Sequence, residues 1–370
     1  MATTFRPRFA VPPGWHLEEK LDELGMTQAE LARRAGLSPK HINQLIAGEV
    51  SLSPRTAVLL ERVTGMPASL WNSYESRWQT HLAEQHASQE LEPLEGWATN
   101  FPLDVMRRRG SISGDAHGPA LVAELLRFFG IAQPNKWDTV YERVVAAQYR
   151  AAPGQQRDPY AVAAWLREAE LAATRVQCAP FDASRARALP ETVRRVARTT
   201  SSAAQWWPEL VRQFSQAGIA LVLVTEYPAL TKLTGATQWQ SASKAIVALT
   251  GRYKRADSLW FTLLHELAHV LLHKRRETFI DVENGASSGS PEEKEADDFA
   301  ARGLLPPELQ AEYDLIPRRD LRAAVRFANR YELPVGAVIG RLQREKRLPP
   351  SYGTKQYHEP LDLSAAYWSA

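Results

Sequence analysis

The chain has 370 residues, a net charge of +3 and a hydrophobic fraction of 44%, and this length predicts two or three domains rather than one small core. A single cysteine, Cys178, excludes a disulfide framework and is typical of a protein from the reducing cytosol. No stretch is apolar enough for a signal peptide or a membrane span, so we expect a cytoplasmic protein without a membrane partner.

The first predicted elements are a helix, a tight turn and a second helix between Gly25 and Gly48. Thr27, with Glu30 three residues later, forms a capping box, and a glycine at position 36 ends the first helix. Ser38 followed by proline starts the second helix, whose outer face is polar. Such side chains can read base edges or hold phosphates, and the candidates are Thr27, Gln28, Ser38, Lys40, His41, Asn43 and Gln44.

Together with the flanking runs Pro12-Pro13-Gly14 and Leu52 to Trp71, this segment resembles the Cro/C1-type (XRE) helix-turn-helix and, more widely, HigA-type antitoxins. The resemblance covers about residues 11 to 85. It implies a five-helix domain that binds a double-stranded DNA operator as a homodimer. Acidic and basic residues nearly cancel here, so the sequence-independent attraction to phosphate is modest. A helix-turn-helix used only for protein contacts stays an alternative.

The middle of the chain is predicted to be helical. Residues 86 to 100 have the composition of a linker or helix end, and residues 101 to 214 carry Ala, Arg and Trp at helical spacing. Two short apolar runs, 218–224 and 244–249, read as buried strands with a turn at 233–237 between them. We expect a small sheet, one edge of which can hold an extended peptide by main-chain pairing.

The most informative motif is His265-Glu266-Leu267-Ala268-His269, which lies in an apolar run. Two imidazoles four residues apart on a helix lie one turn above each other, so both can bind one Zn²⁺ at about 2.1 Å. Glu266 can then act on a water molecule as the catalytic general base without binding the metal. The alternative is a pair of core histidines with satisfied hydrogen bonds, which leaves Glu266 without an explanation.

A third zinc ligand is expected, and its best source is the acidic run from Ser290 to Ala300. Ser290-Pro291 starts a helix on which positions 292, 295, 296 and 299 share one stripe. Glu295 is the predicted ligand, with Glu292 as the second choice, and His273 is more easily explained as a helix C-terminal histidine. Asp298 is predicted to accept the free ring N–H of a ligand histidine. An ordinary solvated acidic helix start is the competing interpretation.

These motifs, with Leu304-Leu305-Pro306 after them, resemble the ImmA/IrrE family of zinc metallo-endopeptidases over roughly residues 215 to 310. The resemblance implies zinc bound by the two histidines and the later glutamate, with Glu266 as the base. It also implies cleavage of repressor proteins. Two further helices, from 318 to 331 and from 335 to 346, are expected to cap this domain.

The sequence therefore predicts a predominantly helical α+β protein with four segments: a DNA-binding domain (1–85), a helical middle region (86–214), a zincin-like peptidase core with a small sheet (215–310) and a helical cap with a tail (311–370). The predicted function is a regulatory zinc endopeptidase that cleaves a repressor or antitoxin, with this chain itself among the candidate substrates. The alternative is an antitoxin-like repressor whose inactive peptidase fold senses a signal or binds a partner toxin. A digestive peptidase leaves the helix-turn-helix unexplained.

Overall fold

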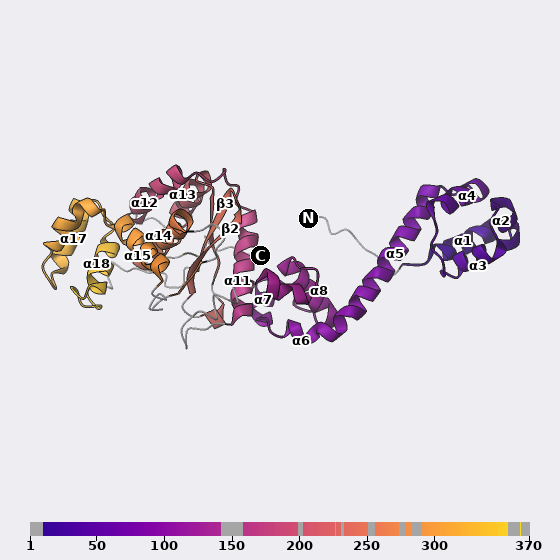
Figure 1. Ribbon diagram of the computed structural model, residues 1–370, viewed down its shortest axis with the longest axis horizontal. Coiled ribbons are helices and arrows are strands. Elements are labelled where there is room, and N and C mark those ends of the chain that lie inside the picture. Colours follow the sequence, from indigo (N-terminus) through magenta and orange to yellow (C-terminus); the bar gives the residue numbers. More distant parts are fainter. Residues whose placement is uncertain are drawn as a thin grey trace. The chain divides into compact units, whose positions relative to one another are not determined.

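The computed structural model describes residues 10–141, 158–198, 203–225, 227–230, 233–250, 256–273, 279–282, 290–353 and 363. Over these residues the chain is predominantly helical with one four-stranded sheet, which confirms the predicted α+β class (Figure 1). It divides into two compact units, residues 1–95 with 118–123 and residues 96–117 with 124–370. In the described segments, no helix has the length and apolar character needed to cross a membrane.

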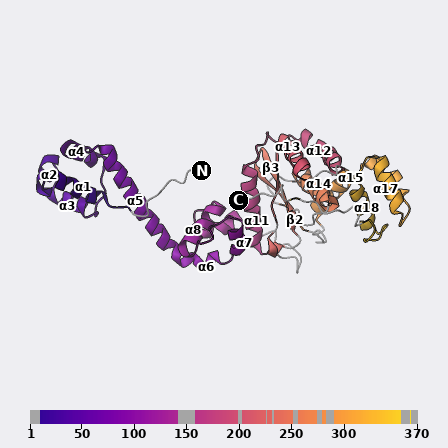
Figure 2. The same ribbon diagram turned by 180° about the vertical axis from the view of Figure 1, so that it is seen from behind.

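The first unit is a helical bundle that continues into a long helix. Figure 2 shows α1 to α4 packed together, with α5 extending from them. Their buried side chains form one core that includes Leu31, Ile42, Leu60 and Trp71. The elements are α1 (Pro13–Glu23), α2 (Gln28–Ala35), α3 (Pro39–Ile46), α4 (Pro54–Thr64), α5 (Ala68–Leu91) and the 3-10 turn η1 (Glu92–Leu94).

The helix boundaries of this unit follow from local capping. The Thr27 hydroxyl accepts a hydrogen bond from the Glu30 amide at 3.2 Å, and the Ser38 hydroxyl accepts one from the His41 amide at 3.1 Å. Gly36 ends α2 at φ +67°, a left-handed conformation that glycine adopts without steric cost. The predicted helix, turn and helix are therefore confirmed.

Downstream of α5 the chain is mixed. The helices are α6 (Glu95–Ala98), α7 (Leu103–Arg108), α8 (Gly118–Phe129), α9 (Trp137–Val140), α11 (Pro159–Thr174), α12 (Ala183–Ala197), α13 (Ala203–Gln216), α14 (Ala256–Leu272), α15 (Pro291–Leu304), α16 (Gln310–Asp314), α17 (Leu321–Arg330) and α18 (Val335–Arg344). The 3-10 turns are η2 (Pro134–Lys136), η3 (Pro228–Leu230) and η4 (Pro307–Leu309). The strands are β1 (Ile219–Leu223), β2 (Leu233–Ser241), β3 (Lys244–Leu249) and β4 (Phe279–Val282).

The sheet has the order β1-β3-β2-β4, with β1 parallel to β3 and the other two pairs antiparallel. Both predicted strands are confirmed as β1 and β3. The predicted turn at 233–237 is wrong, because these residues lie in β2 and pair with β3 on one side and β4 on the other. Gly235 was the misleading signal, since a glycine inside a strand also marks a close approach by another group.

The sheet is buried on both faces, which explains why β1 and β3 are continuous apolar runs. Helix α11 covers one face, and α13 and α14 lie on the other (Figure 1). The odd-numbered residues of β1 and β3 share a core with Leu210 and Phe214 of α13 and with Leu263 and Leu267 of α14. This packing fixes α14, the helix with the histidines, against the sheet.

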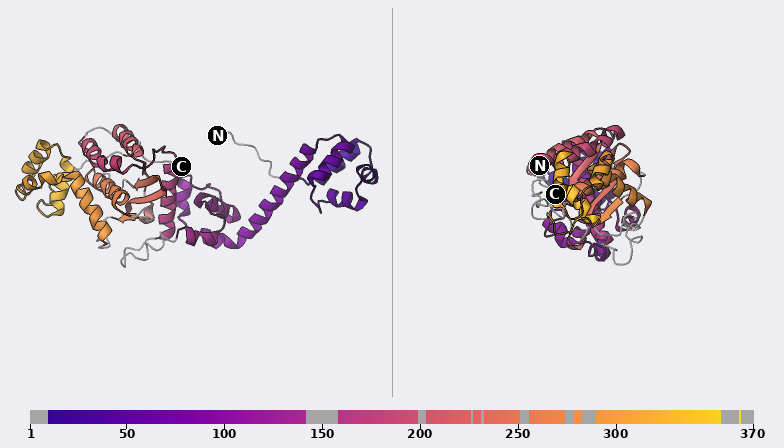
Figure 3. Two further views of the ribbon diagram at one scale, coloured as in Figure 1. Left: turned by 45° about the horizontal axis from the view of Figure 1, so that its top comes forward. Right: turned by 90° about the vertical axis from the view of Figure 1, so that its left-hand side faces the viewer.

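The C-terminal helices α17 and α18 confirm the two predicted cap helices. They have a core of their own that includes Phe327, Ile339 and Leu342. Helix α18 lies between α17 and α14 (Figure 3), and the Arg344 guanidinium stacks 4.2 Å from the centre of the Phe261 ring on α14. The solvent-facing side of α17 is therefore turned away from the sheet domain.

Candidate metal centre

Among its described residues, helix α14 buries three ionisable side chains. His265, Glu266 and His269 are 2%, 0% and 1% exposed, on a helix that otherwise contributes leucines to the core. Burying two imidazoles and a carboxylate costs free energy unless they are paired with one another or with a cation. The arrangement around them therefore decides what they can do.

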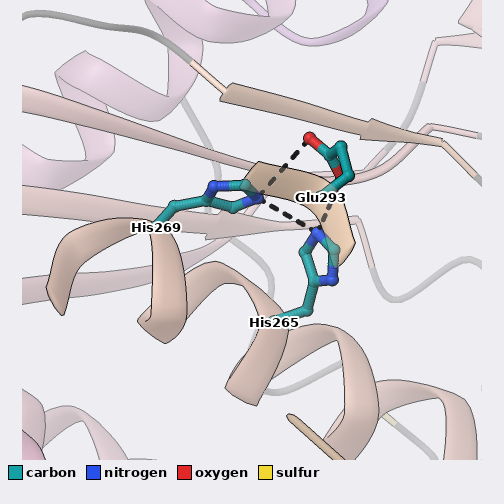
Figure 4. Close-up of side chains that lie close together, drawn as sticks. All are labelled: His265, His269 and Glu293. Atoms are coloured by element: carbon teal, nitrogen blue, oxygen red, sulfur yellow. Dashed lines mark hydrogen bonds and ion pairs between the residues drawn. The ribbon is translucent and has the colours of Figure 1, made fainter. Parts of the chain in front are cut away.

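The two imidazoles meet a carboxylate from α15. The Nε2 atoms of His265 and His269 are 3.1 Å apart, and Glu293 places Oε2 3.1 Å from the first and Oε1 3.7 Å from the second (Figure 4). One ligand atom from each residue lies within 4.8 Å of the other two. Among the described residues this is the one such group of three, and its nitrogen and oxygen donors are those that zinc prefers.

Local structure explains why Glu293 reaches this position. The Ser290 hydroxyl accepts a hydrogen bond from the Glu293 amide at 3.2 Å and so fixes the first turn of α15. One turn later, Ala296 and Ala300 are fully buried, and their small side chains allow α15 to approach α14 closely. Glu293 lies on the same stripe as these alanines and therefore faces the histidines.

The predicted third ligand lies elsewhere. The Glu295 side chain is 63% exposed, and its Oε2 lies 3.4 Å from His273 Nε2 rather than beside the two ligand candidates. The second choice, Glu292, is likewise not in the group of three. The physical reason is the rotation of α15, whose buried face passes through positions 293, 296 and 300 instead of 292, 295 and 299.

The outer nitrogens of both histidines have partners. Asp297 Oδ1 lies 3.0 Å from His265 Nδ1, which is the role predicted for Asp298. Asp298 itself is 70% exposed and pairs with Arg302 at 3.7 Å. His269 Nδ1 lies 2.8 Å from Nδ1 of His273, and the other nitrogen of His273 faces Glu295. Such partners set which ring nitrogen keeps its lone pair for a metal.

The electrostatics also suit a metal ion. The pKa of His269 is lowered to about 2, chiefly by burial and in addition by the neighbouring imidazoles of His265 and His273. The imidazole of His269 is thus neutral at physiological pH, which is the form that binds metals. Two imidazoles and one carboxylate are the nitrogen and oxygen donors that a divalent cation such as zinc takes.

Strand β2 holds the candidate general base. The Thr237 hydroxyl, itself 1% exposed, donates a hydrogen bond to Glu266 Oε2 at 2.6 Å. At Gly235, an added Cβ would lie 2.6 Å from Glu266 Oε1, closer than real Cβ atoms approach. The glycine thus leaves the space that the Glu266 carboxylate fills, and the threonine fixes its direction.

One cross-strand pair supports both the base and a ligand candidate. Thr237 of β2 lies directly opposite Phe279 of β4. Opposed residues of an antiparallel pair point to the same face of the sheet, here the face of α14. The Phe279 ring stacks on the His269 imidazole with centroids 4.1 Å apart and an angle of 16° between the planes. The pair therefore contacts Glu266 through one member and His269 through the other.

A groove opens next to this centre. It lies between α12, α15 and the end of α14, and it has a volume of about 640 Å³. Leu272 and Glu295 bring it close to the histidines, and the rest of its lining includes Arg187, Glu191, Arg194, Phe299 and Arg302. This mixed polar and apolar lining is suited to the side chains of a polypeptide.

The predicted DNA-binding residues lie at the start of α2 and along α3. Ile42 and Leu45 face the core, which leaves Lys40 and Asn43 exposed and His41 and Gln44 half-buried on the other side of α3. The hydroxyls of Thr27 and Ser38 act as helix caps, and Gln28 is half-buried beside the first of them. Arg33 and Arg34 both pair with Glu30. Contacts of these residues with DNA stay a prediction.

Sequence reasoning missed four residues of the centre: Glu293, Asp297, Thr237 and Gly235. The spacing of Glu293 and Asp297 to Ala296 and Ala300 was a usable signal, because i, i+3, i+4 and i+7 positions form one helix face. No local pattern links Thr237 or Gly235 to Glu266, because they meet only through tertiary packing.

Two separate parts of the chain match known protein families. Residues 17–71 match the family model described as helix-turn-helix, and residues 222–343 match the one described as IrrE N-terminal-like domain, which gives this part a metallopeptidase-like fold. The HTH-type transcriptional regulator YddM of Escherichia coli (strain K12) is 32% identical over 73 residues, or 20% of this chain and 78% of YddM.

Two solved structures are similar to a part of the chain. One, from Nostoc punctiforme, is described as an antidote protein of a plasmid maintenance system; it is 26% identical, with a TM-score of 0.22, and covers 23% of this chain and 93% of its own. The other is the Pseudomonas aeruginosa antitoxin HigA with the higBA promoter, 25% identical, with a TM-score of 0.22, covering 23% and 92%.

Proposed function

Because the chain belongs to the HTH-type transcriptional regulators and also carries an IrrE N-terminal-like domain, we propose that it is a DNA-binding zinc endopeptidase that cleaves a repressor or antitoxin protein. The chain itself is among the candidate substrates. The observation that carries the catalytic half is the convergence of His265, His269 and Glu293 from two adjacent helices. The regulatory half rests on the presence of both domains in one polypeptide.

In this proposal His265, His269 and Glu293 hold the zinc ion. Asp297 and His273 accept or donate hydrogen bonds at the outer ring nitrogens and so keep each Nε2 directed at the metal. When bound, zinc supplies Lewis-acid chemistry, which polarises a peptide carbonyl and makes water a better nucleophile near neutral pH. Glu295 takes no part as a ligand, and its carboxylate supports His273 instead.

Glu266 is the general acid and base of the reaction. Its carboxylate accepts the proton of the attacking water and then delivers this proton to the nitrogen of the leaving amine. The Thr237 hydroxyl and the space at Gly235 hold the carboxylate in one orientation, so little reorganisation is required during the proton transfers. The substrate lies as an extended segment along β4, the edge strand next to β2, and its side chains enter the groove beside α15.

The DNA-binding half uses the outer face of α3. His41, Asn43 and Gln44 contact base edges in the major groove, Thr27, Gln28 and Lys40 contact phosphates, and Ser38 lies beside them at the start of α3. Binding as a homodimer would place two copies of α3 at half-sites about 34 Å apart. Recruitment to an operator brings the peptidase to the repressor that occupies the same region of DNA.

The test compares wild-type protein with Glu266→Gln, which removes the base but leaves the metal ligands. We expect both proteins to bind one zinc ion, and only the wild type to cleave a repressor or antitoxin that co-purifies with Glu266→Gln from the native host. The matched control is Glu292→Gln, the same substitution on the first turn of α15, because Glu292 belongs neither to the group of three nor to the lining of the groove. It should cleave like the wild type.

The outcome also separates the two functional classes. Equal cleavage by wild type and Glu266→Gln would refute the catalytic role. Zinc binding without cleavage by any variant, together with normal repression by Glu266→Gln, would instead support a repressor whose peptidase fold only binds a signal or a partner toxin.

A further inference from the structure

Five arginines cover the solvent face of α17 and the turn before it: Arg318, Arg319, Arg322, Arg326 and Arg330. All five side chains are exposed. Four of them follow one another at intervals of four residues, which corresponds to a rise of about 6 Å for each step along a helix. The opposite face of α17 packs Ala324, Phe327 and Ala328 into the cap. The row of arginines, named here the arginine face, is therefore fixed outward by the packing.

The three carboxylates between residues 318 and 347 have other partners. Asp320 accepts a hydrogen bond from the Ala323 amide at 2.8 Å and caps α17, and Glu332 pairs with Arg198 at 3.1 Å. Glu345 accepts hydrogen bonds from Tyr313 and Arg341. Within the described part of the chain, no carboxylate lies at ion-pair distance from the arginine face. Nine basic and three acidic residues lie between 318 and 347.

This arrangement destabilises the isolated helix. Arginines at i and i+4 repel each other, and α17 contains the successive pairs Arg322–Arg326 and Arg326–Arg330. Arg318 and Arg319 add positive charge at the helix N-terminus, where the macrodipole favours negative charge. The cost is not relieved inside the described protein, but a bound polyanion would relieve it.

We propose that the arginine face binds the phosphate groups of double-stranded DNA, as a contact separate from α3. Guanidinium groups bind phosphate in a bidentate manner, and a row of them along a helix can neutralise several phosphates of one backbone. DNA is favoured over an acidic protein because the chain is a member of a helix-turn-helix family whose DNA-binding segment is itself poor in positive charge. Between residues 17 and 71, acidic residues outnumber basic ones by seven to six.

The test measures binding of the full chain to a short duplex of random sequence by fluorescence anisotropy over a range of salt concentrations. The variant Arg322→Ala/Arg326→Ala/Arg330→Ala removes three guanidiniums from the arginine face. Because each phosphate contact contributes about 0.9 to the slope of log K against log[salt], we expect the slope to fall by about 2.7. The corresponding triple lysine variant keeps the charges and should retain most of the slope.

The matched control removes the same net charge from arginines that already have acidic partners. In Arg185→Ala/Arg195→Ala/Arg212→Ala, the changed side chains pair with Asp182, the N-cap residue of α12, or with Glu209 of α13. We expect this variant to keep the wild-type slope. If the slope fell by the same amount in the control and the test variant, the net charge of the protein alone would explain the change, and the proposal would be overturned.

A charge reversal separates binding from folding. In Arg326→Glu, the new carboxylate lies one turn from both Arg322 and Arg330, so repulsion is replaced by attraction. We expect an unchanged or higher melting temperature together with weaker DNA binding. The proposal is overturned if the triple alanine variant binds DNA with the wild-type slope. In that case the arginine face does not contact DNA, whether or not it binds an acidic peptide. These measurements use neither the peptidase activity nor an operator, so they are independent of the proposed function.

Discussion

Replacing Glu293 by alanine tests which carboxylate completes the metal centre. The sequence favoured Glu295, whereas Glu293 is the carboxylate that lies 3.1 Å from His265 Nε2 and 3.7 Å from His269 Nε2. The two glutamates are on the same turn of α15 and carry the same charge. Glu293→Ala and Glu295→Ala are thus a matched pair that differ in which histidine the lost carboxylate faced.

The expected magnitudes differ strongly. An apparent zinc-binding free energy of about 10–16 kcal/mol in zinc-finger peptides, shared among their four ligands, gives about 2.5–4 kcal/mol for one ligand. Glu293→Ala should therefore weaken zinc binding by a factor on the order of several hundred. Glu295→Ala removes a partner of His273, which in turn contacts His269, and changes of this kind cost about 10-fold to 100-fold. Because the Glu295 side chain is 63% exposed, we expect a value at the lower end of that range.

The assay is competition for zinc against a fluorescent chelator at neutral pH, with elemental analysis for stoichiometry and thermal unfolding of the metal-free proteins as a check on folding. Glu292→Ala removes the same charge from the first turn of α15 and should bind zinc like the wild type. A larger loss in Glu295→Ala than in Glu293→Ala would refute the ligand assignment and restore the choice made from the sequence.

Three further predictions concern the surroundings of the centre and the stability of each unit. Gly235→Ala would place a Cβ 2.6 Å from Glu266 Oε1, so we expect unchanged zinc binding but a loss of cleavage on the order of 100-fold, since a displacement of about 1 Å is enough for such a loss. Gly303→Ala, whose Cβ would press on Leu264 instead, should lower the melting temperature without this specific loss. Arg109→Ala would leave the buried Glu168 carboxylate without the guanidinium that pairs with it at 2.7 Å; the free energy of unfolding in urea should fall by about 3–5 kcal/mol, whereas the exposed neighbour variant Arg108→Ala should change little. Burial lowers the pKa of His16 below its usual value of 6.5, and Glu19 opposes this effect. Above pH 6.5 the neutral His16 imidazole contributes fully to the stability of the fold. As the pH falls below 6.5, this contribution decreases, because the unfolded chain takes up a proton at His16 before the folded chain does. The difference in melting temperature between about pH 7.5 and about pH 5.5 should shrink in His16→Phe, which keeps the stacking contact with Tyr74, and an unchanged difference would contradict this assignment.

Capping explains why the first unit could be read from the sequence. Thr27, Gly36 and Ser38 act within three residues of the groups that they satisfy, so the helix ends are local properties. The His265 and His269 pair is also local, because both lie on one helix. The carboxylate beside the two histidines, that of Glu293, lies on the predicted helix but on another side of it than Glu295, since the rotation of α15 depends on how Ala296 and Ala300 pack against α14.

Interactions between distant segments left no signal in the sequence. Glu168 lies in a run of alanines, yet it is fully buried and binds Arg109, Ser111 and Tyr227, each more than fifty residues away. Gly235 read as a turn because glycine has the same local signature in a turn and at a crowded strand position. Which of the two applies at Gly235 depends on α14, which places Glu266 against this strand position.

Because Thr237 pairs with Phe279, the register of β2 and β4 determines both the hydrogen bond to Glu266 and the stacking on His269. If β4 slipped by one residue along β2, the aromatic ring would turn to the other side of the sheet and leave His269 without its stacking partner. A corresponding slip of β2 would also withdraw the hydroxyl from Glu266. Insertions or deletions of one residue near this strand pair should therefore inactivate the centre in an all-or-none manner, even where every residue that touches metal or substrate is retained.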